Sequence, residues 1–192
     1  MRRKWITALA AVFLVLALAA FVHLFGLKPM RAGADVQSVG VTRTGSFELP
    51  DTPDHVFSLF GPIDEAKWAE GWAIETLYSP QAQPSAGMIF NTRQHGGARL
   101  LWTVADLDAA NHKIVYVTFL PDDSIGVLEI ICRSSSPSST TVTVTHSRVG
   151  LSENGNHHAL RYTQEKHQAQ LEAWQHAITY YLKTGGRLAH HE

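Results

Sequence analysis

A succession of short apolar segments without helices between them is the feature that most constrains the fold. Six segments rich in Val, Ile, Thr and aromatic residues occupy residues 73–78, 87–93, 99–106, 112–120, 125–133 and 140–148. Turn-forming residues separate them at short intervals. Because parallel strands need a connection of a dozen or more residues, this spacing predicts an antiparallel meander.

Further elements precede this meander. Residues 39–49 are typical of one more strand. Residues 52–54 (Thr-Pro-Asp) combine a capping hydroxyl, a proline at the first helical position and an acid in the first turn, which predicts a short helix. Residues 61–62 (Gly-Pro) repeat the signal for a second short helix that ends near Trp68.

A long helix is predicted after the meander, over residues 156–183, closed by two glycines at 185–186. One face is apolar in its C-terminal half, which includes Trp174, but polar in its N-terminal half, which includes Thr163 and His167. Either the helix projects past the sheet at its start or this half faces a partly wet cavity.

The N-terminal segment indicates export. Residues 5–27 are apolar apart from Thr7 and His23 and would extend about 34 Å as a helix, enough to cross a hydrocarbon core of about 30 Å. Three basic residues precede them, so the positive-inside rule places the rest of the chain on the extracytoplasmic, periplasmic side. The alternative is a secreted protein cleaved near Ala34, after a small-x-small sequence.

Charge and motif patterns narrow the function classes. Beyond residue 34 the chain has 17 acidic and 11 basic residues, a formal charge of −6, which argues against nucleic acid as a partner. The histidines lack metal-ligand spacing, and Cys132 is a lone cysteine predicted to be a buried, inert thiol. The sequence shows no Gly-rich phosphate loop and no nucleophile elbow, so we assign no metal, no cofactor and no catalytic residue.

Several segments, in this order, resemble the SRPBCC (START-like) superfamily, in particular a polyketide cyclase/lipid-transport-like branch. They are residues 47–50 (FELP), 56–62 (VFSLFGP), 65–72 (EAKWAEGW), 87–90 (GMIF), 102–104 (WTV), 114–116 (IVY), 141–145 (TVTVT) and Trp174. The resemblance covers about residues 45–184.

The resemblance implies an α+β helix-grip fold. It comprises a curved antiparallel sheet of about seven strands around a long C-terminal helix, with two short helices after the first strand and an elongated apolar cavity. The expected organisation is a transmembrane anchor or signal segment at 1–27, a linker at 28–44, the START-like domain at 45–184 and a tail at 185–192. Relatives hold lipids, sterols, polyketides or plant hormones in the cavity, and a few are cyclases.

Candidate ligand contacts are aromatic or polar residues on otherwise apolar faces: Trp68, Trp72, Trp102, Tyr116, Glu129, His146, Thr163, His167 and Trp174. Aromatic residues in a small domain also serve as core, and buried histidines are often satisfied by structural hydrogen bonds. Glu129 shares a face with Val127 and Ile131. If that face is concave its pKa is raised, whereas on the convex face it is an ordinary exposed acid.

The resulting expectation is an exported domain, tethered to the membrane by its N-terminal helix, that binds a small hydrophobic molecule such as a lipid or aromatic metabolite. One alternative is a cyclase-type enzyme acting on an enolisable hydrophobic substrate. Another is a protein-interaction module without a ligand, whose protein partner the sequence does not identify.

Overall fold

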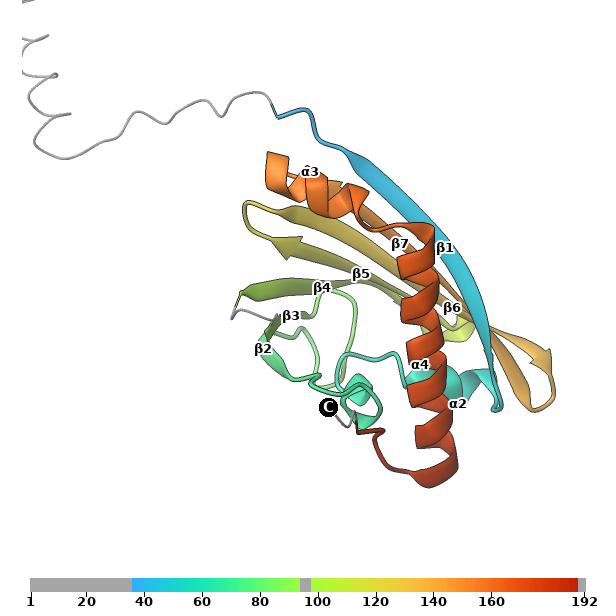
Figure 1. The fold of residues 1–192 in the computed structure, drawn as a ribbon. Coiled ribbons are helices and arrows are strands. Elements are labelled where there is room, and N and C mark those ends of the chain that lie inside the picture. Colours follow the sequence, from blue (N-terminus) through green and yellow to red (C-terminus); the bar gives the residue numbers. More distant parts are fainter. Residues whose placement is uncertain (1–35, 94–97, 190–192) are drawn as a thin grey trace, which may run out of the picture. The chain divides into compact units, whose positions relative to one another are not determined.

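A computed structural model describes residues 36–93 and 98–189 of the chain (Figure 1). The apolar leader and the last histidines lie outside these residues, so the membrane anchor, the linker start and cleavage near Ala34 stay predictions. Within the described ranges, no helix is long and apolar enough to cross a membrane.

Seven antiparallel strands form one curved sheet, as the sequence predicts. They are β1 (Gly40–Leu49), β2 (Ile74–Tyr78), β3 (Ile89–Arg93), β4 (Arg99–Asp108), β5 (Lys113–Leu120), β6 (Ser124–Ser136) and β7 (Ser139–Gly150). Their order is β1-β7-β6-β5-β4-β3-β2. Strands β2 to β6 therefore each pair with the next strand along the chain, and β1 pairs with β7 at the edge of the sheet. A 3-10 turn, η2 (Ala109–Asn111), connects β4 to β5.

The two predicted short helices are present and pack at one end of the sheet. They are α2 (Pro53–Ser58) and the 3-10 helix η1 (Asp64–Lys67). The expected hydroxyl cap of Thr52 is not formed, and its backbone N–H donates to Asp51 Oδ1 at 2.7 Å instead.

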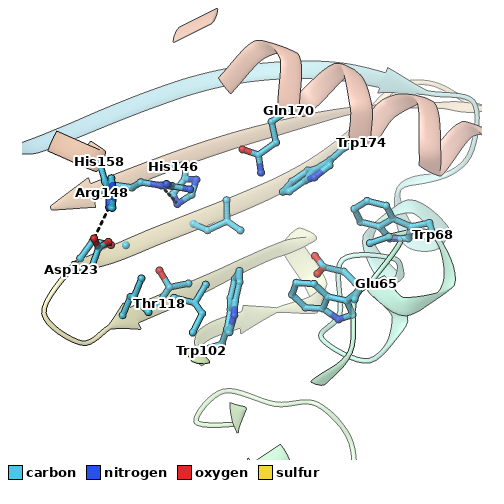
Figure 2. A pocket seen from close by; sticks show the side chains of 17 residues that line it. Glu65, Trp68, Trp102, Thr118, Asp123, His146, Arg148, His158, Gln170 and Trp174 are labelled. Carbon is cyan, nitrogen blue, oxygen red and sulfur yellow. Dashed lines mark hydrogen bonds and ion pairs between the residues drawn. The ribbon is translucent and has the colours of Figure 1, made fainter. Parts of the chain in front are cut away.

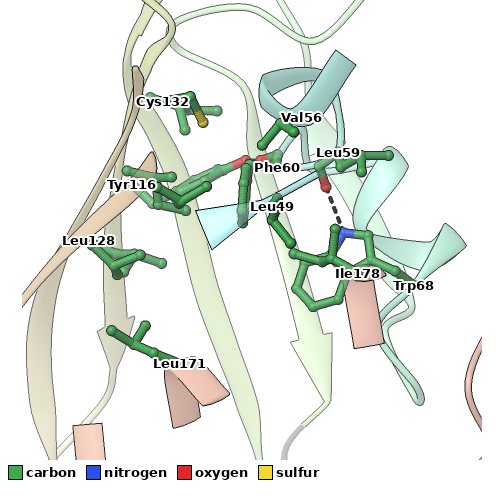
Figure 3. Close-up of a cluster of buried hydrophobic side chains, with 14 of the residues drawn as sticks. Leu49, Val56, Leu59, Phe60, Trp68, Tyr116, Leu128, Cys132, Leu171 and Ile178 are labelled. Atoms are coloured by element: carbon green, nitrogen blue, oxygen red, sulfur yellow. Dashed lines mark hydrogen bonds between the residues drawn. The ribbon is translucent and has the colours of Figure 1, made fainter. Parts of the chain in front are cut away.

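Two buried hydrogen bonds fix the segment around these helices to the core. The Tyr116 hydroxyl donates to the Phe60 carbonyl at 2.7 Å, and the Trp68 indole N–H donates to the Leu59 carbonyl at 2.8 Å (Figure 3). Cys132 is fully buried in this cluster, and burial raises the pKa of its thiol to about 12. The thiol is therefore protonated at neutral pH, as expected for an inert core cysteine.

The prediction of a single long C-terminal helix over residues 156–183 is wrong. The segment forms α3 (Glu153–Leu160) and α4 (Gln164–Thr184). Ser152 and Thr163 each cap one helix, their hydroxyls accepting from the backbone N–H three residues on, at 3.0 and 3.3 Å. Thr163 has extended backbone angles, which end one helical hydrogen-bond ladder and start the next.

Gly45 allows α4 to lie close against β1. Figure 1 shows α4 running across the concave side of the sheet near this strand. A Cβ at Gly45 would lie 2.7 Å from Leu171 Cδ1 and 3.5 Å from His167 Cδ2. Both of these side chains are buried beneath the helix. The missing side chain at this position therefore sets the distance between helix and strand.

Replacing Gly45 with Val is expected to lower the free energy of unfolding by about 1–3 kcal/mol, because the added methyl groups overpack the contact with Leu171. Chemical denaturation measures the effect. Gly40→Val on the same strand is the matched control, since a Cβ there meets only ordinary van der Waals contacts, with Val149 Cγ2 at 3.6 Å and the Arg148 carbonyl oxygen at 3.9 Å. Equal destabilisation by both substitutions would contradict the proposed role of Gly45.

Candidate functional site

A cavity of about 450 Å³ lies between the sheet and α4. The strands that line it are β4 to β7, and the segment after α2 closes one end. Figure 2 shows that its two ends differ in chemistry: Glu65 and Trp68 lie at one end, and Asp123, Arg148 and His158 at the other. We call these the aromatic end and the polar end.

Four tryptophans wall the aromatic end. Trp68 and Trp174 meet edge to face with ring centroids 5.8 Å apart, and Trp72 and Trp102 do so at 5.4 Å. Such T-shaped pairs are favourable beyond the area that they bury. The indoles therefore support one another as a rigid apolar wall.

Three of these indole N–H groups are already used by the protein. The N–H of Trp68 donates to Leu59, that of Trp72 donates to the Pro62 carbonyl at 2.8 Å, and that of Trp102 donates to the Thr92 hydroxyl at 2.9 Å. These three rings therefore offer a ligand carbon surface and π-electrons but no free donor.

Glu65 is a buried carboxyl at this end of the cavity. Its exposed fraction is 5%, and it lies in η1 with its carboxyl among the labelled tryptophans of Figure 2. Among residues 36–93 and 98–189, its carboxyl oxygens have no hydrogen-bond or ion-pair partner. Loss of hydration therefore raises the pKa of Glu65 well above its ordinary value of 4.5.

The polar end carries a chain of hydrogen bonds behind the cavity wall. His146 Nδ1 lies 3.2 Å from the Tyr162 hydroxyl, which lies 2.8 Å from His167 Nδ1. His167 Nε2 lies 3.3 Å from the Val144 carbonyl, and Arg148 Nε donates to His146 Nε2 at 3.4 Å.

With both imidazoles neutral, His167 Nε2–H donates to the Val144 carbonyl, His146 Nδ1–H donates to the Tyr162 oxygen, and His146 Nε2 accepts from Arg148. The single Tyr162 proton then has two acceptors, His167 Nδ1 at 2.8 Å and Gln170 Oε1 at 3.1 Å, and is donated to one of them at a time. Burial lowers the pKa of both histidines, and burial with the nearby charges of Arg148 and His167 brings that of His146 to about 3. His146 is therefore neutral at physiological pH.

Charged groups complete the polar end. Arg148 stacks over the Tyr162 ring, with its guanidinium carbon 4.3 Å from the centroid. His158 Nδ1 and Asp123 Oδ1 lie 2.6 Å apart. The His158 side chain is 48% exposed, and it lines the cavity beside its partner Asp123.

The structure brings together five of the nine residues predicted to contact ligand: Trp68, Trp72, Trp102, His146 and Trp174 line the cavity. Their contact with a ligand stays a prediction.

The other four do not line the cavity. Tyr116 is core and bonds to Phe60, and Thr163 caps α4. His167 is 1% exposed and buried behind the wall. Glu129 lies on the convex face, because the alternating Leu128 and Ile130 fill the concave one.

Sequence reasoning missed Glu65, Arg148, Asp123 and the lining role of His158. Glu65 is an acidic residue in the first turn of a short helix, and acids at that position are usually exposed. The 3-10 helix η1 ends at Lys67, so helical spacing does not explain why Glu65 and Trp72 line the same cavity. No local spacing links Arg148 to Asp123. Arg148 lies on β7 and Asp123 directly precedes β6, so the pairing of these two strands brings both residues to the same end of the cavity.

No cluster of His, Cys, Asp or Glu suited to a metal ion occurs in the part of the chain that the structure describes.

The architecture is that of the helix-grip fold, and comparison with known proteins supports this. Neither a family model nor a curated protein sequence matches the chain. Its structure is similar to norcoclaurine synthase from Thalictrum flavum in complex with dopamine and hydroxybenzaldehyde (12% identity, TM-score 0.59, covering 81% of this chain and 96% of that one).

Two further solved structures are similar. The Zhui aromatase/cyclase from a Streptomyces species shares 17% identity, with a TM-score of 0.56 over 79% of this chain and 100% of that one. A protein from Rhizobium loti shares 20% identity, with a TM-score of 0.53 over 74% of this chain and 99% of that one. The resemblance to SRPBCC-type proteins is thus confirmed for the fold.

The neutral histidines predict a pH dependence of stability. Their folded pKa values lie below the ordinary 6.5, so the unfolded chain binds protons that the folded protein does not. The free energy of unfolding should fall as the pH drops from about 6.5 toward 3, by up to about 1.4 kcal/mol per pH unit for His146, and His167 should add to the fall below its ordinary pKa.

Urea denaturation at several pH values tests this dependence. The slope should be shallower in His146→Gln than in the wild type, while the exposed His176→Gln control should keep the wild-type slope. An unchanged slope in His146→Gln would contradict the proton assignment.

Proposed function

We propose that this domain binds a small, largely apolar molecule, a lipid or an aromatic metabolite, in the cavity between the sheet and α4. The observation that carries the proposal is the wall of four tryptophans along a cavity of about 450 Å³. This volume lies within the range of typical small-molecule sites, which are mainly apolar with a few orienting polar groups.

The polar end supplies the orienting groups. Arg148, His146, Gln170 and Thr118 line it. Apolar contact with the indoles would provide most of the binding free energy, at about 25 cal/mol per Å² of buried apolar surface. The polar groups would select one direction of entry.

Binding is favoured over cyclase-type acid–base catalysis by the state of His146. With a pKa of about 3, this imidazole is a weak base at neutral pH, far from the matched pKa that general-base catalysis needs. The second candidate function is catalysis on an enolisable substrate. It is suggested by the similar structures that are named as aromatase/cyclases.

We further propose that the leader exports the domain and holds it at the membrane. The support is the basic N-terminus followed by an apolar run of 23 residues. A tether would raise the concentration of the domain near membrane-derived ligands.

A bulky substitution in the cavity should abolish ligand retention. Ala69 lines the cavity, whereas Ala66 in the same segment is exposed. Native mass spectrometry of the full chain, incubated with extracted membrane lipids, should show a retained small molecule in the wild type and in Ala66→Trp. Ala69→Trp should retain about tenfold less, because an indole occupies the ligand's space. A wild-type protein that retains nothing would overturn the proposal.

N-terminal sequencing of the exported protein tests the tether. An intact leader on the mature protein is the expected result. A mature N-terminus at Asp35 would show cleavage after Ala34 and a secreted domain.

A further inference from the structure

We propose that the aromatic end of the cavity binds the ammonium group of an amine with an apolar body, with Glu65 as its counter-ion and the tryptophans around it. This inference rests on the proposed function, because it uses the same cavity and specifies the class of ligand.

The carboxyl of Glu65 is suited to a charged partner from a ligand. Glu65 is 95% buried and lines the cavity, yet no described residue bonds to its oxygens. Buried carboxyls are normally hydrogen-bonded or paired, because an unsatisfied one costs free energy. A partner supplied by the ligand would complete this site.

The aromatic rings around Glu65 are suited to a cation. The N–H groups of Trp68, Trp72 and Trp102 bond to the protein, which leaves their carbon surfaces for the ligand. The face of an indole carries partial negative charge and attracts cations, and aromatic cages bind ammonium groups in this way. A carboxyl beside such rings favours a cation over a neutral or anionic group.

The distribution of charge around Glu65 also favours an ammonium group. On its own helix, Asp64 and Lys67 form an exposed ion pair at 2.7 Å. From β5, Tyr116 faces it, with the hydroxyl already donating to Phe60. From α4, the lining residues are the uncharged Trp174 and Gln170. No described cation therefore neutralises Glu65.

The remaining titratable groups of the cavity lie at its polar end: Asp123, His146, Arg148 and His158 (Figure 2). The cation among them, Arg148, would repel an ammonium group. The two ends together orient an amine with its charged group toward Glu65 and its body along the tryptophans.

Binding should be coupled to release of a proton. In the empty site, burial raises the pKa of the Glu65 carboxyl and so favours its protonated form. When an ammonium ion enters, the carboxyl ionises to pair with it, and its proton passes to the solvent. One positive charge enters and one leaves, so the charge of the site does not change, and affinity rises with pH until Glu65 is ionised in the empty site.

Titration calorimetry of the full chain with phenylbutylamine and phenylbutanol tests the inference. These probes have the same apolar body and differ in charge. At pH 7 the amine should bind about tenfold or more tightly than the alcohol. Titrations in two buffers with different ionisation enthalpies should show net proton release when the amine binds, and none when the alcohol binds.

Glu65→Gln should remove both the preference and the proton release, with little effect on the alcohol. Glu129→Gln is the matched control, because this carboxyl lies on the convex face, and it should behave as the wild type. Glu65→Asp keeps the charge and should retain part of the preference, which separates loss of charge from altered packing.

The outcomes distinguish this inference from the proposed function. Equal binding of both probes would overturn the ammonium site and leave the hydrophobic cavity intact. Tighter binding of the alcohol, weakening as the pH rises, would show that protonated Glu65 donates a hydrogen bond instead. Binding of neither probe would count against both proposals.

Discussion

The close packing of α4 against β1 is the contact on which the site depends. At Gly45 the absence of a side chain lets Leu171 and His167 approach the strand, so the helix is held at one side of the curved sheet. Strands β4 to β6 on the other side are left with a concave face that α4 does not fill. The cavity is the space between this face and α4.

The two ends of this cavity satisfy their polar groups differently. At the polar end, His146, Tyr162 and His167 hold one another in a chain that runs to a backbone carbonyl. Such a chain fixes these side chains, so that His146 is held in place where it lines the cavity. At the aromatic end, Glu65 has no comparable partner, and burial of its carboxyl is a cost that a ligand with the right charge would offset.

Local patterns predicted most of the fold. The alternation in residues 140–148 and the turns between apolar segments indicated the strands of the sheet, because strand formation depends on neighbouring residues. The break between α3 and α4 was missed, although Thr163 is an ordinary cap residue, because helical periodicity continues through it. The face that Glu129 occupies could not be chosen, since alternation shows which residues share a face but not which way the sheet curves.

The sequence by itself determined the meander, the aromatic content and the basic, apolar leader, since each is a property of residues close together in the chain. Only the tertiary structure decided that β1 pairs with β7 and that Trp68, Trp102 and Trp174 wall one cavity. The tertiary structure also decided that Glu65 is buried among these rings. These outcomes depend on contacts between segments far apart in the chain, and the choice among such contacts follows from packing of the whole domain rather than from any local pattern.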